Sequence, residues 1–329
     1  MSQLIRILDA SAISEARRAT RAAAQAAGLG QAKLERAVLV ASETATNLHR
    51  HAVNGRFSAT VSLRGDLVLL GLDDGPGMEN PARMMQDQVS TGSSLGVGLG
   101  AMERLSDRFE LWSRAGAGTV TACVFEIEGA TAPEPPGLDG LRVAAPGQAA
   151  CGDVFAWRTM RAGVQVLLCD GFGHGETAAR DAERIRAAFE AASGDAGTVM
   201  QTLCAVDDMH RGAVALVADL PRDGGRLTAA GVGNIAGAIV TRETTRRLIS
   251  REGSVGRRCK VQAETYDLPP DALLVLHSDG LKTFRFEAQH RDLFYRSSLA
   301  AAAIILRERL RGPDDASIIV LGRPGGDDE

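Results

Sequence analysis

Glu43 and Asn47 are two side chains suited to metal and proton chemistry, and they lie four residues apart in the segment 31–53. Apolar residues recur in this segment at helical spacing, which predicts a helix that projects both side chains from one face. An asparagine amide oxygen is a good Mg²⁺ ligand, and a nearby carboxylate can orient or deprotonate a nucleophile. The pair alone is more typical of a solvated helix face, so its interpretation depends on the segments that follow.

Three glycine-rich segments come after this helix. The first, "LDDGPGM", ends a predicted strand, where Asp73 can accept from an exocyclic amine and Gly75 and Gly77 let the backbone approach a flat base. The second, "STGSSLGVGLGAMERL", opens a predicted helix whose free N–H groups suit phosphate oxygens. Its glycines are Gly96, Gly98 and Gly100. The third, "RAGAGT", places Thr119 at the start of a strand.

Each of these motifs is weak by itself, but their order and spacing resemble the N, G1, G2 and terminal boxes of the GHKL ATPase and kinase superfamily. Residues 1–127 are most similar to the small anti-sigma-type serine kinases of the RsbT/RsbW group, and "TGSSLGVGLGAMERLSDRFELWS" resembles the RsbT branch. The resemblance implies ATP and Mg²⁺ as cofactors, Asn47 as a Mg²⁺ ligand and Glu43 as the general base that activates a serine hydroxyl of a protein partner. It implies that Asp73 reads adenine. The remaining nucleotide contacts would be Gly75, Gly77, Gly96, Gly98, Gly100 and Thr119.

The second half of the chain carries aspartates at the ends of apolar runs. They are Asp153 before "VFAWRTM", Asp170 after "VQVLLC", Asp279 after "ALLVLHS", and Asp314 and Asp315 before "ASIIVL". Such strand ends can converge on one rim of a sandwich, and oxygen ligands without a His/Cys cluster suit Mg²⁺ or Mn²⁺ and not zinc. A two-metal site of this kind activates water for phosphoryl displacement, whereas any single aspartate here is more typical of an ordinary turn.

The ordered set "CGD…CDGFGHG…GVGN…HSDGL…GPDDAS" resembles the metal-dependent PPM-type phosphatases of the SpoIIE family, most closely the short RsbX-like form, over about residues 140–322. The metal ligands that this resemblance implies are Asp153, Asp170, Asp279 and Asp314, with the Gly171 carbonyl as a further candidate. His174 and the basic residues of the segment 257–260 could contact a substrate phosphate, although a turn role and a solvated loop are the simpler interpretations.

The elements that must position these residues form two α+β domains. A Pro- and Gly-rich segment, 128–140, predicts a linker between a domain at 1–127 and a domain at 141–323. The first is expected to be a GHKL-type α/β sandwich with helices on one face of a mixed sheet, and the second a PPM-type αββα sandwich. Helices are expected at about 11–27, 31–53, 98–106, 175–193, 195–205 and 291–309.

Composition disfavours two further classes of protein, those that bind nucleic acid and those that span a membrane. The chain has 329 residues, a net charge of −4 and five cysteines. This charge does not favour nucleic acid as a partner, and no apolar run reaches the roughly 20 residues that a membrane helix needs. The cysteines form no CxxC pair, so we expect them to be reduced in a cytoplasmic protein that lacks a signal peptide.

The sequence therefore predicts a bifunctional switch regulator. The family resemblance implies the substrate class: the first domain would phosphorylate Ser/Thr of an STAS-type antagonist protein or stressosome-like scaffold, within a sigma-factor pathway, and the second would remove the phosphate with Mn²⁺ or Mg²⁺. An alternative is that the first domain is an ATP-dependent anti-sigma or partner-binding module without kinase turnover, fused to an active phosphatase. Glu43 argues against this alternative because a pure binding module does not need a base there.

Overall fold

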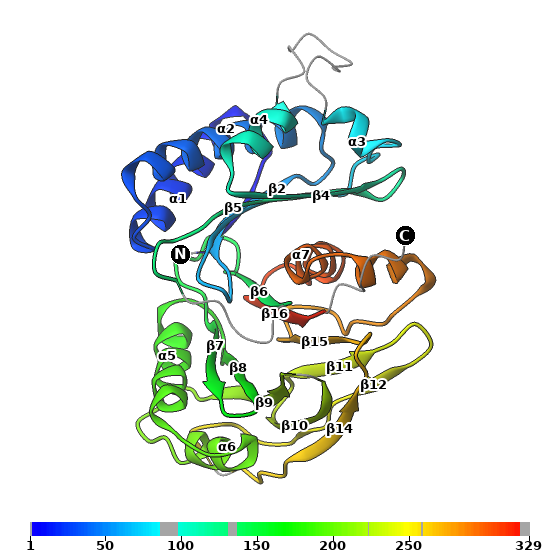
Figure 1. The fold of residues 1–329 in the computed structure, drawn as a ribbon. Coiled ribbons are helices and arrows are strands. Elements are labelled where there is room, and N and C mark those ends of the chain that lie inside the picture. Colours follow the sequence, from blue (N-terminus) through cyan, green and yellow to red (C-terminus); the bar gives the residue numbers. More distant parts are fainter. Residues whose placement is uncertain (1, 86–97, 131–136, 223, 258, 323–329) are drawn as a thin grey trace. The chain divides into compact units, whose positions relative to one another are not determined.

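The computed structural model describes residues 2–85, 98–130, 137–222, 224–257 and 259–322. The contacts within the chain divide it into two compact units, Met1–Thr131 and Ala132–Glu329. No helix within the described ranges is long and apolar enough to cross a membrane. Figure 1 labels most of the elements of each unit.

The first unit is a five-stranded sheet with helices. Its elements are β1 (Leu4–Arg6), α1 (Ala10–Ala26), α2 (Gln31–His51), β2 (Arg56–Val61), β3 (Leu67–Asp73), α3 (Pro81–Met84), α4 (Gly98–Leu105), β4 (Arg108–Arg114) and β5 (Gly118–Phe125). The strand order is β1-β2-β3-β5-β4, and every pair is antiparallel. The expected mixed sheet is wrong in this detail. The connection through α3 and α4 leads to β4, and the hairpin that follows places β5 between β4 and β3, antiparallel to both.

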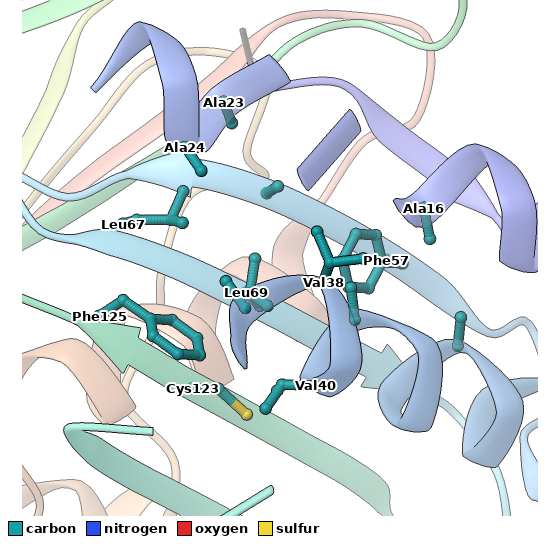
Figure 2. Close-up of a cluster of buried hydrophobic side chains, with 14 of the residues drawn as sticks. Ala16, Ala23, Ala24, Val38, Val40, Phe57, Leu67, Leu69, Cys123 and Phe125 are labelled. Carbon is teal, nitrogen blue, oxygen red and sulfur yellow. The ribbon is translucent and has the colours of Figure 1, made fainter. Parts of the chain in front are cut away.

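Helices α1 and α2 pack on one face of this sheet (Figure 1). Ala16 and Ala24 are fully buried on α1, and their small side chains let the helix approach closely. Phe57 and Phe125 are fully buried on the sheet beneath, as Figure 2 shows. Each such large side chain contributes about 2 kcal/mol of hydrophobic stabilisation, so this layer holds α2, the helix that carries Glu43, firmly on the sheet.

The second unit contains two sheets. Its elements are β6 (Leu138–Val143), β7 (Asp153–Met160), β8 (Gly163–Gly171), α5 (Glu176–Ala191), α6 (Ala196–Cys204), β9 (Ala213–Pro221), β10 (Gly225–Val232), β11 (Ala236–Val240), β12 (Thr245–Arg247), β13 (Ser250–Arg251), β14 (Glu264–Leu268), β15 (Leu273–His277), a 3₁₀ helix (Ala288–Tyr295), α7 (Ser298–Arg309) and β16 (Ala316–Leu321). One sheet has the order β13-β10-β9-β8-β7 with β14 on β10, and the other has the order β12-β11-β15-β16-β6. Helices α5 and α6 pack on the first sheet and α7 on the second (Figure 1), which confirms the expected helix–sheet–sheet–helix layering.

Strand β6 begins inside the segment expected to be a linker. Residues 138–140 pair with β16, where Leu138 is opposite Leu321 and Gly140 is opposite Ile319. Leu138 is fully buried. The prediction of a linker as far as residue 140 is therefore wrong at its end, because apolar burial and an available sheet edge outweigh the local Pro and Gly content.

The helix expected at 291–309 is two elements. The 3₁₀ helix ends at Tyr295, Arg296 is extended, and α7 starts with Ser297 as its N-cap. The Ser297 hydroxyl accepts a hydrogen bond from the Ala300 N–H at 3.1 Å. This cap starts a new helix where the apolar periodicity alone predicts a continuous one.

The cysteines also differ from expectation. Cys204, at the end of α6, and Cys259 form a disulfide with their Cα atoms 6.2 Å apart. The prediction that all five are reduced is wrong for this pair, because residues 55 positions apart in sequence meet in the fold. Cys123, Cys151 and Cys169 are free.

Candidate functional site

The first residue of α4 lies against the two polar side chains of α2. A Cβ atom added at Gly98 would lie 3.3 Å from Asn47 Nδ2, 3.4 Å from Asn47 Oδ1 and 3.6 Å from Glu43 Oε2. The Asn47 amide is positioned by Met102 of α4, whose Sδ accepts from Nδ2 at 3.7 Å. Glu43 itself is exposed. A magnesium-type ligand and an accessible carboxylate thus meet at the start of a helix.

Asp73 ends β3 as a buried carboxylate, 9% exposed. Its Oδ1 accepts a hydrogen bond from the Gly75 N–H at 2.6 Å. A Cβ at Gly75 would lie 2.7 Å from the same oxygen, and a Cβ at Gly77 would lie 2.0 Å from the Arg114 carbonyl oxygen. Gly77 also has a positive φ of 66°, so its position requires glycine. Because glycine has no Cβ, the backbone of this turn leaves room for a flat nucleobase beside Asp73.

Thr119 lies directly beside Asp73, because these residues are partners in the β3–β5 ladder. Ser113 Oγ lies 3.0 Å from Thr119 Oγ1 and accepts from the Met78 N–H at 2.9 Å. Ser113 therefore ties the glycine turn to the last hairpin. Sequence reasoning misses this serine, since nothing distinguishes it from other strand serines.

The remaining expected phosphate contacts are only partly described. Gly100 is buried in the first turn of α4. Gly96 lies outside the described residues. The glycine turn, the paired Asp73 and Thr119, and the Glu43–Asn47 pair under Gly98 are all of the type that fits a nucleotide with Mg²⁺.

Strand register brings the aspartates of the second unit to one end of its sheets. Asp153 and Asp170 are direct partners at the end of the β7–β8 ladder. In the other sheet, β15 ends at His277 and its antiparallel neighbour β16 begins at Ala316. Asp279 follows the one strand and Asp314 precedes the other, so these acids also share one sheet end.

Asp153 is fully buried and connects the two sheets. Its Oδ2 accepts hydrogen bonds from the Ser278 hydroxyl at 2.6 Å and the Ser317 hydroxyl at 2.7 Å. Its Oδ1 is buried and has no hydrogen-bond partner within the described residues. A buried carboxylate oxygen without a donor is costly unless a cation binds it or a proton neutralises it.

The electrostatics of this group favour a cation. Burial raises the pKa of Asp153 to about 7, against the opposing effect of the hydroxyls of Ser278 and Ser317. Burial, and then the charges of Asp153 and Asp279, raise the pKa of Asp170 to about 10. Such mutual repulsion is the arrangement that divalent cations relieve.

Asp315 has a different task from its neighbour. Its two carboxylate oxygens accept from the backbone N–H groups of Ala145 at 2.6 Å and Gly152 at 2.7 Å. Asp315 therefore fixes the backbone just before Asp153, while Asp314 is less buried. The two adjacent aspartates look equivalent in the sequence, so this difference between Asp314 and Asp315 could not be predicted from it.

Two further residues, Asn234 and Gly171, lie beside the aspartates at this end of the sheets. The Asn234 amide donates to Asp279 Oδ2, which gives the asparagine of "GVGN" an orienting role. Gly171 follows Asp170, is buried, and its N–H donates to the Gly152 carbonyl at 3.0 Å. A Cβ at Gly171 would lie 2.4 Å from the Ala178 carbonyl oxygen, so this position requires glycine.

The acids fit a pair of hard cations by chemistry. Within the described ranges, no three Asp, Glu, His or Cys side chains form a ready metal cage. The orphaned Asp153 Oδ1, the mutual effect of the acids on their pKa values and the all-oxygen donor set nevertheless suit Mg²⁺ or Mn²⁺. The residues are thus a cluster of candidate ligands whose side chains would need to adjust around an ion.

The two histidines beside these acids are unlike each other. His277 is buried, its Nδ1 lies 2.8 Å from the Ser278 carbonyl oxygen, and its Nε2 accepts from the Phe284 N–H at 3.4 Å. Burial lowers its pKa, so it is neutral and structural. His174 is exposed in the "GFGHG" loop.

Fold and site together define a chain that joins a GHKL-type ATP-binding domain to a PPM-type phosphatase domain. The family model described as "Histidine kinase-like ATPase domain" matches residues 8–124, and the one described as "Stage II sporulation protein E (SpoIIE)" matches residues 161–323. The chain is 36% identical over 118 residues to the serine/threonine-protein kinase RsbT of Bacillus subtilis (strain 168), which covers 35% of this chain and 89% of the relative. Through its first domain the chain belongs to the RsbT family of serine/threonine kinases, and its second domain is a SpoIIE-type, metal-dependent phosphatase domain.

The solved structures that are similar to this chain include the following two. One is a chain from the bacterial stressosome, with 26% identity over 55% of this chain and 96% of that chain and a TM-score of 0.48. The other is RsbX in complex with magnesium, with 20% identity over 56% of this chain and 92% of that chain and a TM-score of 0.48. The SpoIIE match begins after Asp153, but the pairing of β7 with β8 and of β6 with β16 shows that residues 138–160 belong to the same domain.

Proposed function

We propose that this protein sets the phosphorylation state of one protein partner in both directions. The first domain transfers a phosphoryl group from ATP to a serine or threonine, and the second hydrolyses the resulting phosphoester. The observation that supports this most directly is that one chain holds both a Glu43–Asn47 pair under a glycine-opened helix and a buried Asp153 with an unpartnered oxygen among further acids.

For phosphorylation, we assign Glu43 as the base that accepts the proton of the attacking hydroxyl, which its exposure makes accessible to a protein substrate. Asn47 would hold Mg²⁺, and Asp73 with the glycine turn would hold the adenine ring of ATP. Gly96, Gly98 and Gly100 would receive the phosphates and Thr119 would border the pocket. These residues mainly position the reactants, which is the principal need of phosphoryl transfer.

For dephosphorylation, we assign Asp153, Asp170, Asp279 and Asp314 as ligands of two divalent cations, with the Gly171 carbonyl as a further ligand. When bound, the cations would supply charge neutralisation for the phosphate and activation of the attacking water. Ser278 and Ser317 hold Asp153 in place, Asn234 holds Asp279, and Asp315 holds the backbone before Asp153. The protein thereby fixes the ligands from outside the cluster.

The substrate class follows from the sequence resemblance to the RsbT/RsbW group, whose targets are STAS-domain antagonists. We therefore propose an STAS-domain protein, alone or in a stressosome-like scaffold of a sigma-factor pathway, as the shared substrate. Attachment of both domains to one chain fits a single target, since each activity then acts at the same place.

The test is reconstitution with a purified STAS-domain protein, ATP and Mg²⁺, with phosphoserine followed by mass spectrometry. Asp170→Ala should accumulate phosphoserine, wild type should accumulate less, and Glu43→Ala in the Asp170→Ala background should accumulate none. Asp271→Asn, an exposed acid at the other end of β15, serves as a matched control and should behave as wild type. Absence of phosphoserine with Asp170→Ala would remove the kinase assignment.

The second candidate function is an ATP-dependent binding module fused to an active phosphatase. It shares every nucleotide contact and differs only in needing no base at Glu43. Single-turnover transfer from labelled ATP separates the two, because a binding module forms the partner complex without transfer in wild type. Hydrolysis of p-nitrophenyl phosphate with Mn²⁺ tests the phosphatase half independently.

A further inference from the structure

The backbone of His210, Arg211 and Gly212 is clamped by a buried acid that the phosphatase assignment does not use. Asp181 on α5 is fully buried, and its carboxylate accepts from the N–H groups of these three residues at 3.0, 2.7 and 3.1 Å. Although burial opposes it, these bonds hold the pKa of Asp181 below its usual value. The acid is therefore charged and holds one short segment in a fixed place.

The segment 210–212 places the guanidinium of Arg211 against the loop that follows Asp170. The Arg211 Nη1 donates to the Phe172 carbonyl at 3.4 Å, and the Phe172 N–H donates to the Gly212 carbonyl at 3.0 Å. A Cβ added at Gly173 would lie 2.5 Å from Arg211 Nη1. The side chain thus crosses the loop that follows Asp170, where Gly173 leaves room for it.

That loop is in turn part of the candidate metal site. Gly171 bonds to the Gly152 carbonyl, and a Cβ at Gly152 would lie 3.4 Å from the Gly173 carbonyl oxygen. Gly152 directly precedes Asp153. Arg211 is exposed, and within the described residues the long bond to Phe172 is the one hydrogen bond its guanidinium makes. Most of its donors are therefore available to a ligand at this rim.

We propose that Arg211 binds the phosphate group of the phosphoserine substrate, as a positioning residue at the edge of the metal site. The inference rests on the proposed phosphatase function. A guanidinium presents two parallel N–H donors to phosphate oxygens. The bonds from Asp181 fix the backbone of residue 211, from which this side chain extends. Arg211 thereby holds the non-reacting oxygens of the phosphate while the acids hold the cations.

Other cations near the acids are less suited to this task. The Arg142 guanidinium donates to the Asp153 carbonyl at 3.2 Å and lies over the Phe155 ring at 5.4 Å. Through these contacts it supports the strand. Arg257 is exposed, and its neighbour Gly256 lies against Met209, which precedes His210. Arg257 is therefore a basic residue on a neighbouring loop, and its variant serves as a comparison for Arg211.

The test compares Arg211→Ala, Arg211→Lys, Arg257→Ala and Arg161→Ala in the full chain. Arg161 is an exposed arginine in the turn at the opposite end of the β7–β8 hairpin, so it controls for loss of charge. The clamp uses the backbone N–H of residue 211, so it persists in both Arg211 variants. Thermal unfolding of each variant verifies that the fold is retained.

With Mg²⁺ or Mn²⁺ and a phosphoserine peptide, Arg211→Ala should raise KM about 10- to 100-fold, the range for a charged hydrogen-bonding pair, with a smaller change in kcat. The inhibition constant of inorganic phosphate should rise in parallel. Arg211→Lys should recover part of the loss, since a lysine supplies charge without the fork. Arg257→Ala and Arg161→Ala should match wild type.

Binding of inorganic phosphate in the presence of Mg²⁺, measured by calorimetry, tests the same residue without turnover. Wild type that binds phosphate at least tenfold more tightly than Arg211→Ala supports the assignment even if the protein hydrolyses no phosphoester, a result that contradicts only the proposed function. Equal phosphate affinity in wild type and Arg211→Ala, or no phosphate binding by wild type, overturns it. A loss reproduced by Arg161→Ala also overturns it.

Discussion

The acidic cluster should make the metal-free phosphatase domain less stable as pH rises. Burial and the charges of Asp153, Asp279 and Asp314 raise the pKa of Asp170 to about 10 from 3.8. Between these values the folded chain retains a proton that the unfolded chain has released. Stability therefore falls with rising pH, by about 1.4 kcal/mol per unit for one proton. This is opposite in sign to the behaviour of an ion-paired aspartate.

The size of the effect is measurable. From pH 6 to pH 8 the loss for one proton is about 3 kcal/mol, which for a domain of this size corresponds to a fall in Tm of about 6–12 °C. Asp170→Asn removes the proton equilibrium and the repulsion, so its Tm should exceed that of wild type, and by more at pH 8 than at pH 6. Saturating Mn²⁺ should remove the pH dependence of wild type, because cations replace the proton.

The assay is thermal unfolding by circular dichroism in EDTA across pH 6–8, repeated with Mn²⁺. Asp271→Asn is the matched control, since it removes an exposed acid from the opposite end of β15, and its curve should run parallel to wild type. If the Tm difference between wild type and Asp170→Asn is the same at pH 6 and pH 8, Asp170 does not retain a proton in the folded chain over this range, and the reasoning from its burial is refuted.

Three further predictions concern other parts of the chain. Gly77→Ala should destabilise the first domain by about 2 kcal/mol or more in urea unfolding, because its Cβ would meet a carbonyl oxygen at 2.0 Å, whereas Gly116→Ala meets nothing and should cost only about 1 kcal/mol for its positive φ. Asn47→Ala should weaken Mg²⁺-dependent ATP binding about tenfold or more in calorimetry, with little change when Mg²⁺ is absent. Cys204→Ser should destabilise the oxidised second domain by about 4 kcal/mol, the loop-closure value for a separation of 55 residues, and a reductant should lower the Tm of wild type to that of the variant. An unchanged wild-type Tm on reduction would show that the Cys204–Cys259 bond does not contribute.

The elements and the grouping of the acids were within reach of the sequence. Strand ends are marked by apolar runs that stop at an aspartate beside a glycine, and antiparallel neighbours bring such ends together, as in Asp153 opposite Asp170. The i, i+4 pair on α2 is likewise a local property, so Glu43 and Asn47 are found on one face as predicted.

What the sequence could not supply depends on long-range contacts between common residue types. Ser278 and Ser317 read as ordinary strand serines, and only the fold directs both hydroxyls at Asp153. The clamp of Asp181 on the segment of Arg211 joins an interior helix position to a loop about thirty residues later, with no motif at either end. The antiparallel order of the first sheet and the early start of β6 were missed because pairing partners override local composition.

The position of β6 decides where this polypeptide can be divided. The second unit begins at Ala132, and β6 is its first strand. This strand pairs with β16 and is followed by Ala145, whose N–H donates to Asp315. A cut before Leu138 would leave the second domain with its edge strand, whereas a fragment trimmed to the SpoIIE-matched residues 161–323 would lose that edge together with Asp153. A fragment that begins just before Leu138 should therefore keep the hydrolase domain whole, whereas one trimmed to the family match should be damaged.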